Sequence, residues 1–213
     1  NKKKIDFIQN KALELSLFLS LPATIALLIA SEEITSSLFG YGSFTELSVK
    51  NSANALFYFA LGLPAFSFIK IFSSFLFARH NTKTPFYFSV TSVIINIIIS
   101  IYYFNKIGFI IIPIATTISS WFNVIILLVY LSNKKYYLLN LSFIKSLLKI
   151  MLSTILTSYI FYILINYFSD SLSYNSEYKL LSIILLVIVT FIIYILISIL
   201  TKAFKISDIK LKY

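Results

Sequence analysis

The residue of this sequence with the clearest capacity for chemistry is Lys70, which stands alone in the apolar stretch GLPAFSFIKIFSSFLF. It precedes Arg79 by nine residues, which corresponds to about 13 Å of helix. Ser67 and Ser74 share its helical face, so the three residues form a narrow polar stripe. Within a membrane, such a cation normally faces protein or a water-filled cavity. Lys70 could therefore meet an anionic substrate or a carboxylate, or its stem could follow the helix until the ammonium reaches the lipid headgroups.

Three neutral polar residues in the next apolar runs could bind an ion. Asn96, Ser100 and Thr116 offer oxygen atoms that suit a monovalent cation, but the set has no charged ligand of its own. The alternative is hydrogen bonding between helices, which contributes about 0.6 kcal/mol on average in membranes. Both interpretations fit the sequence.

Two prolines lie inside apolar runs and could act as hinges. Pro64 occurs in GLPAF and Pro113 in GFIIIPIATT. Interrupted helices free backbone carbonyls and allow hinge motion in transporters. Prolines are also frequent in membrane helices without such a role, so the sequence leaves both alternatives open.

The groups that many enzymes need are missing from the sequence. It has no cysteine, so it offers no disulfide, thiolate metal site or cysteine nucleophile. A single histidine, His80, cannot build a multi-histidine metal site. There is no phosphate-binding glycine loop and no pair of carboxylates at membrane depth. We therefore expect a protein that is not an enzyme and has no cofactor, apart from a monovalent coupling ion.

Composition indicates a membrane protein. Hydrophobic residues make up 59% of the chain, charged residues 12%, and the mean hydropathy is +0.90. Soluble domains carry about 25% charged residues. Most of the uncharged runs approach or exceed the ~20 residues that a helix needs to cross a bilayer. The sequence predicts an all-α, polytopic transmembrane bundle of six helices, at about 16–38, 51–77, 86–104, 109–132, 145–168 and 180–203.

The positive charges predict the orientation of these helices. With the N-terminus in the cytoplasm, fourteen Lys and Arg residues fall on that side and three fall outside. Cytoplasmic loops of membrane proteins carry such an excess. Both termini of the chain are then cytoplasmic, and the net charge of +10 reflects anionic lipid headgroups and not nucleic acid. The fourteen are Lys2, Lys3, Lys4, Lys11, Arg79, Lys83, Lys134, Lys135, Lys145, Lys149, Lys202, Lys205, Lys210 and Lys212, and the three are Lys50, Lys106 and Lys179.

The stretch FLFARHNTKTP (75–85) forms the first internal cytoplasmic turn in this topology. Its cations fix the orientation of the two helices that it joins. Pro85 can lie in the first turn of the second helix, where its missing N–H would have no partner in any case. The residues of this turn are Arg79, Asn81, Thr82, Lys83, Thr84 and Pro85.

Four stretches together resemble one family. They are LSLPATIALLIASEEITSSLFGYGSFT, ALFYFALGLPAFSFIKIFSSFLFARHNTKTP, VIINIIIS and GFIIIPIATTISSWFN. Their order and spacing resemble the MurJ/MviN lipid II flippases of the multidrug/oligosaccharidyl-lipid/polysaccharide exporter superfamily. The resemblance extends over about residues 15–135, and the last two helices match in length and apolar character.

The resemblance implies that the chain is part of the C-terminal lobe of a fourteen-helix flippase, at helices nine to fourteen. Residues 1–135 would hold four spans with the family signature, and residues 136–213 the last two helices and a cytoplasmic tail. Such a protein moves lipid II, the undecaprenyl-diphosphate-linked peptidoglycan precursor, across the bacterial cytoplasmic membrane by alternating access. Its partners would be lipid II, membrane lipids and the missing N-terminal lobe.

The resemblance also bears on the polar residues. Family members have a cation site where Asn96, Ser100 and Thr116 fall, often with an acidic residue near Ser100. Serine at that position weakens the expectation of ion coupling. The alternatives to a lipid II flippase are an O-antigen or polysaccharide repeat-unit flippase and a non-transporting membrane scaffold. An enzyme acting on polyprenyl phosphates would need acidic residues at membrane depth or at the interface, and the few acids of this sequence lie mostly on the outer side.

Overall fold

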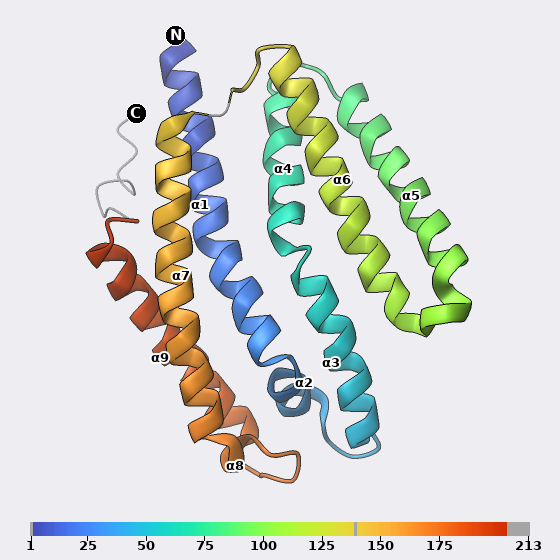
Figure 1. The fold of residues 1–213 in the computed structure, drawn as a ribbon, viewed down its shortest axis with the longest axis vertical. Helices are drawn as coiled ribbons and strands as arrows, with labels where there is room; N and C mark the ends of the chain where they lie inside the picture. Colours follow the sequence, from blue (N-terminus) through green and yellow to red (C-terminus); the bar gives the residue numbers. More distant parts are fainter. Residues whose placement is uncertain (1, 139, 204–213) are drawn as a thin grey trace. The chain divides into compact units, whose positions relative to one another are not determined.

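A computed structural model describes residues 2–138 and 140–203, and no strand occurs among them. The helices are α1 (Lys2–Ile29), α2 (Ser31–Phe39), α3 (Glu46–Ala60), α4 (Leu63–Phe77), α5 (Lys83–Ile107), the 3₁₀ turn η1 (Gly108–Ile110), α6 (Ile111–Asn133), α7 (Leu141–Tyr167), α8 (Ser169–Leu172) and α9 (Lys179–Leu200) (Figure 1). The all-α prediction is confirmed.

Several of these helices are long and apolar enough to cross a membrane. Four stretches among the described residues meet this condition, and the bent pair α3–α4 raises the number to five. One stretch is 51 residues long and contains both α5 and α6. These are separate helices of 25 and 23 residues, joined where Gly108 adopts a φ of 75°. The prediction of six spans is therefore approximately right.

The chain folds into two compact units that interleave in sequence. Unit 1 contains residues 1–20 and 58–143, and unit 2 contains residues 21–57 and 144–213. This division follows contacts in space. The predicted division at residue 135 instead marks the point in the sequence where the family motifs end.

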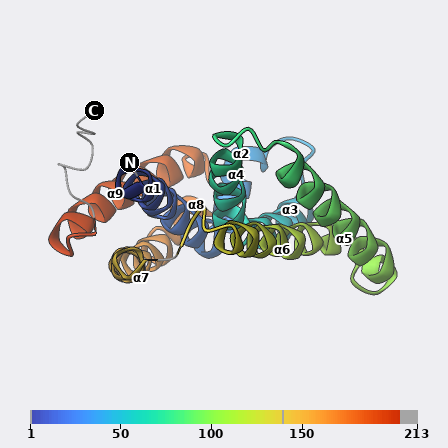
Figure 2. The ribbon, with the colours of Figure 1, turned by 90° about the horizontal axis from the view of Figure 1, so that it is seen from above.

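Unit 1 is organised around α6, which packs against both α4 and α5 (Figure 2). The face of α4 that is buried carries Ala65, Phe72 and Leu76, which share one side of the helix. The face of α6 that is buried includes Ala115 and Leu127, both 0% exposed. Small side chains on such faces allow close approach of membrane helices.

Unit 2 has an apolar core built from α7, α8 and α9 and from the link between α1 and α2. Phe161 and Ile165 of α7, Ile183 and Leu186 of α9, and Ala30 before α2 form this core together with Leu172. The helix α2 also packs against α9. The core therefore fixes the short helix α2 against the beginning of α9.

Two of the predicted helices differ from those in the structure. The first helix starts at Lys2 and not near residue 16, because its charged lead-in consists of good helix formers such as Lys, Leu and Ala. It ends at Ile29, after which α2 forms a separate helix. The second predicted helix is broken between Ala60 and Leu63, and its halves α3 and α4 are bent by 41°.

Candidate functional site

The polar stripe on α4 lies on the face opposite the unit 1 core. Lys70 and Ser74 are exposed, and Ser67 is partly buried. The Ser74 hydroxyl donates a hydrogen bond to the Lys70 carbonyl at 2.8 Å, within the helix. The Lys70 ammonium forms no ion pair or hydrogen bond with any described residue. The structure thus places the stripe on one face and leaves its cation available.

The turn between α4 and α5 is held together by Asn81. Its Oδ1 accepts a hydrogen bond from the Thr84 backbone N–H at 3.1 Å, and its Nδ2 donates to the Thr84 hydroxyl at 2.9 Å. The first N–H groups of a helix have no partner within it, so the asparagine caps the start of α5. Its Nδ2 also reaches the Tyr130 hydroxyl on α6 at 3.3 Å. Asn81 therefore fastens the turn to the end of α6.

Arg79 joins the same turn to the loop after α6. Its guanidinium donates to the Phe75 carbonyl at 2.6 Å and to the Tyr136 carbonyl at 3.2 Å. It also lies 4.6 Å from the centre of the Tyr136 ring, within the range of a cation–π contact. The sequence did not reveal that Tyr130 and Tyr136 are the partners of this turn.

The other turn residues are more open. Thr82 and Lys83 are exposed, and His80 is exposed with a φ of 57°. Pro85 is buried and is the third residue of α5, in the first turn, where no helical hydrogen bond to its nitrogen is lost.

Asn96 and Thr116 meet between α5 and α6. The Asn96 Nδ2 donates to the Thr116 hydroxyl at 3.0 Å, and that hydroxyl donates to the Ile112 carbonyl at 2.8 Å. The Ser100 hydroxyl is buried and has no hydrogen-bond partner in the described residues. The pair bridges two helices, and one buried hydroxyl nearby has unused bonding capacity.

The break between α3 and α4 is stabilised from α6. A broken helix leaves carbonyl groups without their usual partners. The Thr117 hydroxyl donates to the Tyr58 carbonyl at 2.7 Å, and the indole N–H of Trp121 donates to the Leu61 carbonyl at 3.1 Å. A Cβ at Gly62 would lie 3.1 Å from the Thr117 hydroxyl, so glycine permits this close approach.

The two prolines have different positions relative to helix ends. Pro64 is the second residue of α4, directly after the break. Pro113 is the third residue of α6, which continues unbroken to Asn133. The missing N–H of each proline falls in the first turn of its helix, where it costs little.

Lys179 is a buried cation that sequence reasoning assigned simply to the outer side. It is 2% exposed, and its ammonium donates to the carbonyls of Gly40 and Tyr174, each at 2.6 Å. It also lies 4.3 Å from the centre of the Tyr41 ring and 4.7 Å from that of Tyr174. The Ser37 hydroxyl donates to the Lys179 carbonyl at 3.2 Å. Hydrophobicity patterns cannot reveal this fixed position, because the Gly40 carbonyl that accepts one of the bonds is 139 residues away.

Tyr137 is a second buried anchor, in unit 1. It is 2% exposed, and its hydroxyl donates to the Asn10 Oδ1 at 3.0 Å. Its ring packs against Phe72 and Phe75 of α4. Burial, with a smaller contribution from the Glu14 charge, raises the pKa of Tyr137 to about 12. This residue therefore ties α1 to α4 within the unit.

The fold and these polar positions define a multi-pass helical membrane protein. Within residues 2–138 and 140–203, no group of three or more His, Cys, Asp or Glu residues is placed to hold a metal ion. Hydroxyl and amide groups such as those of Asn96 and Thr117 bridge neighbouring helices, as is typical of membrane helix packing.

Comparison with known proteins identifies the family. A family model described as "Lipid II flippase MurJ" matches residues 1–184. The chain belongs to the MurJ family, and the resemblance drawn from its motifs is confirmed.

Individual relatives agree with this assignment. The chain is 37% identical over 180 residues to a probable lipid II flippase MurJ of Rickettsia prowazekii, covering 84% of this chain and 35% of that protein. It is 40% identical over 104 residues to the probable lipid II flippase MurJ of Thermotoga maritima, covering 49% and 22%. A solved structure of lipid II flippase MurJ in an inward closed conformation matches with a TM-score of 0.75 and 26% identity, covering 95% of this chain and 40% of the other.

The chain thus spans about a third of the length of the curated relative in Rickettsia prowazekii. Relatives that match most of this chain are named as lipid II flippases, which are transporters. Membership of the family and the apolar helices make this a multi-pass protein of the bacterial inner membrane.

Proposed function

We propose that this chain is the C-terminal part of a lipid II flippase. The whole protein would move the undecaprenyl-diphosphate-linked peptidoglycan precursor from the cytoplasmic to the outer leaflet by alternating access. The observation that carries the proposal is the match to the lipid II flippase family along residues 1–184. The names of the relatives favour lipid II over an O-antigen or polysaccharide repeat unit.

Lys70 provides the proposed contact with the substrate. Its ammonium projects from the open face of α4, with Ser67 and Ser74 on the same stripe. An anionic diphosphate would satisfy a cation that has no partner in the described part of the chain. The missing N-terminal lobe would supply the rest of the cavity.

We place the turn containing Arg79 and Asn81 on the cytoplasmic side, together with both chain termini. The charge asymmetry of the sequence supports this orientation. In this position the turn would serve as a rigid connection between α4 and α5, because both residues bond to α6 or to the loop that follows it.

The break before Pro64 is the proposed bending point during alternating access. Discontinuous helices are common at the moving parts of transporters. The bond from Thr117 can break and re-form without any loss of covalent structure, so it suits a reversible bend. Pro113 would restrict the conformation of the first turn of α6 in the same region of unit 1.

The proposed coupling ion is monovalent. Asn96, Ser100 and Thr116 supply neutral oxygens and no carboxylate, so the set fits sodium better than a divalent metal. If these residues hold sodium, Ser100→Asp in the complete protein should tighten its binding, because a charged ligand joins the set. Thermal unfolding in sodium chloride against choline chloride would measure this. Equal midpoints in both salts for the parent and the variant would exclude the ion site.

The proposed function can be tested in cells depleted of their own flippase. Expression of the complete polypeptide that carries this chain should restore labelling of the precursor headgroup by a membrane-impermeant reagent. A version that lacks residues 1–213 should insert but fail to restore labelling. Restored growth without any exposed precursor would contradict transport and favour a scaffold.

A further inference from the structure

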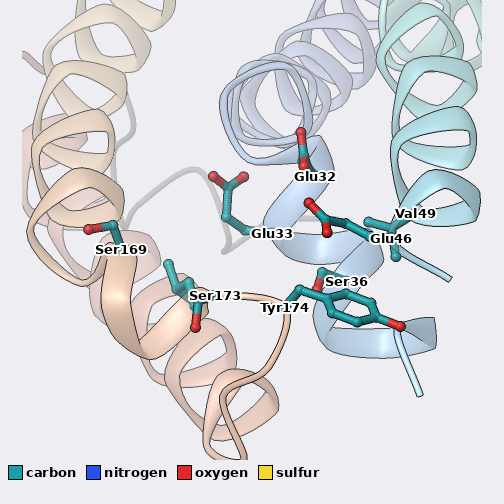
Figure 3. A pocket seen from close by; sticks show the side chains of 9 residues that line it. Glu32, Glu33, Ser36, Glu46, Val49, Ser169, Ser173 and Tyr174 are labelled. Atoms are coloured by element: carbon teal, nitrogen blue, oxygen red, sulfur yellow. The ribbon is translucent and has the colours of Figure 1, made fainter. Parts of the chain in front are cut away.

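A pocket of about 180 Å³ opens in unit 2, where α2, α3 and α8 come together (Figure 3). None of the residues proposed to contact the substrate or the coupling ion lines this pocket. It is lined by Glu32, Glu33, Ser36, Glu46, Val49, Ser169, Leu172, Ser173 and Tyr174. Three carboxylates, four hydroxyl groups and two aliphatic side chains therefore surround one space, with no basic side chain among them.

Two of the three carboxylates have no ion pair in the described part of the chain. Glu46 lies 3.4 Å from Lys50, which balances it. The ammonium of Lys179 is bonded to the carbonyls of Gly40 and Tyr174, and it forms no ion pair with these carboxylates. Glu32 and Glu33 form no ion pair with any described residue. The pocket thus carries negative charge without an ion-pair partner, which attracts a cation.

Two further features indicate that polar groups of the pocket are not fully satisfied by the protein itself. Ser36 is 4% exposed, and its hydroxyl has no hydrogen bond in the described part of the chain although the residue lines the pocket. Buried hydroxyls normally have a partner. Burial, and to a smaller degree the neighbouring Glu32, raise the pKa of Glu33. Such a carboxylate is the kind that a bound cation would stabilise in its charged form.

We propose that this pocket binds a primary alkylammonium group. A metal ion does not fit, because no three acidic side chains in the described residues converge on one point. An ammonium has three N–H donors, which can be divided between Glu33, the Ser36 hydroxyl and a second carboxylate. The aliphatic side chains of Val49 and Leu172, both buried, would contact the carbon chain that carries the nitrogen.

Two sources can supply this chemistry, namely the headgroup of an aminophospholipid and an amine carried by a solute or by the transported substrate. The pocket itself recognises what they share. Its affinity for an ammonium does not depend on whether the whole protein transports lipid II, so the two proposals can fail separately.

The test is a titration of the complete polypeptide in detergent with n-butylammonium chloride, followed by calorimetry. n-Butanol and tetramethylammonium chloride serve as controls, because the first lacks the charge and the second lacks N–H donors. The parent protein should bind n-butylammonium and bind both controls at least about tenfold more weakly. No saturable binding, or equal binding of all three, would overturn the proposal without any variant.

Variants then assign the site. Glu33→Gln should weaken n-butylammonium binding about tenfold, and Ser36→Ala should weaken it about threefold. Glu177→Gln removes an equal charge from an exposed position of the same unit that does not line the pocket, and should leave binding unchanged. Equal weakening by Glu177→Gln and Glu33→Gln would show a diffuse electrostatic effect and overturn the site.

Nanodiscs of two compositions distinguish the sources. If phosphatidylethanolamine discs lower the apparent affinity for n-butylammonium relative to phosphatidylglycerol discs, the headgroup occupies the pocket. If the affinity is the same in both, the natural ligand is an amine from solution or from the substrate. Either result supports an ammonium site, and absence of binding in both overturns it.

Discussion

At the scale of single residues, Lys70 and Lys179 show how differently two lysines in one apolar chain can be accommodated. Lys179 is surrounded by carbonyl oxygens and aromatic rings and is fully used in holding α9 to the end of α2. Lys70 is exposed on α4 and has no bonding partner among the described residues. The donors of Lys179 are thus satisfied within unit 2, whereas the Lys70 ammonium is open to a partner.

Lys70→Ala should therefore reduce lipid II export by the complete protein, by about tenfold, while its membrane insertion stays normal. The physical reason is the loss of a charge-assisted bond to the anionic diphosphate. Export is measured by labelling of the precursor at the cell surface, with protein abundance measured in parallel.

Lys106→Ala is the matched control, because Lys106 is an exposed cation at the end of α5. Lys70→Arg should retain most of the activity, since the charge is kept. Normal export by Lys70→Ala at normal abundance would exclude the proposed substrate contact.

Tyr137 gives a prediction about pH. Its folded-state pKa of about 12 lies above the ordinary value of 10.0, so the folded state favours the neutral phenol. Its contribution to stability is fully present below pH 10 and declines as the pH rises towards 12. Tyr137→Phe should lower the unfolding free energy by about 1 kcal/mol at neutral pH and remove this part of the alkaline decline.

Unfolding curves at several pH values would check the prediction. Tyr167→Phe provides a control, because Tyr167 is 81% exposed. A decline above pH 10 that is identical in the parent and in Tyr137→Phe would show that another group causes it.

At the scale of elements, the sequence predicted α5, α6, α7 and α9 to within a few residues. Each contains a long uncharged run that begins directly after a lysine, and hydropathy registers such limits directly. It pointed to Pro64 as a possible hinge, next to the break before Leu63, but it could not identify the bonds that stabilise this break. The bonds that stabilise the break come from Thr117 and Trp121, which are 59 and 60 residues away from their partners.

The same contrast applies to the candidate site. The sequence indicated that Lys70 shares a face with two serines, because helical periodicity alone decides it. It could not show that Asn81 caps α5 while bonding to Tyr130, since that contact depends on how α5 and α6 pack. Nor could it show the pocket beside Glu33, whose walls come from segments more than a hundred residues apart.

Thr117→Val tests the stabilisation of the break. The variant leaves the Tyr58 carbonyl without its partner, so the complete protein should lose about 1–3 kcal/mol of stability. Thr91→Val is the matched control, because the Thr91 hydroxyl bonds only to a carbonyl of its own helix, at 2.9 Å. Equal losses in the two variants, measured by unfolding in detergent, would show that the bond across the break has no special role.

At the scale of the whole molecule, the distribution of charge makes a prediction about topology. The described residues carry no native cysteine, so single cysteines can be introduced without interference from them. In intact cells, Lys106→Cys should react with an impermeant maleimide, whereas Lys83→Cys should react only after permeabilisation. Reaction of Lys83→Cys in intact cells would reverse the proposed orientation.

Trp121 also gives this protein an optical signature. It is the single tryptophan among 213 residues, and its indole N–H is bonded to the carbonyl exposed by the helix break. Indole emission moves to longer wavelength when water replaces a protein partner. The emission wavelength of this one ring therefore reports the state of the bend between α3 and α4. A fluorimeter can follow the bend in this part of the protein without any added dye.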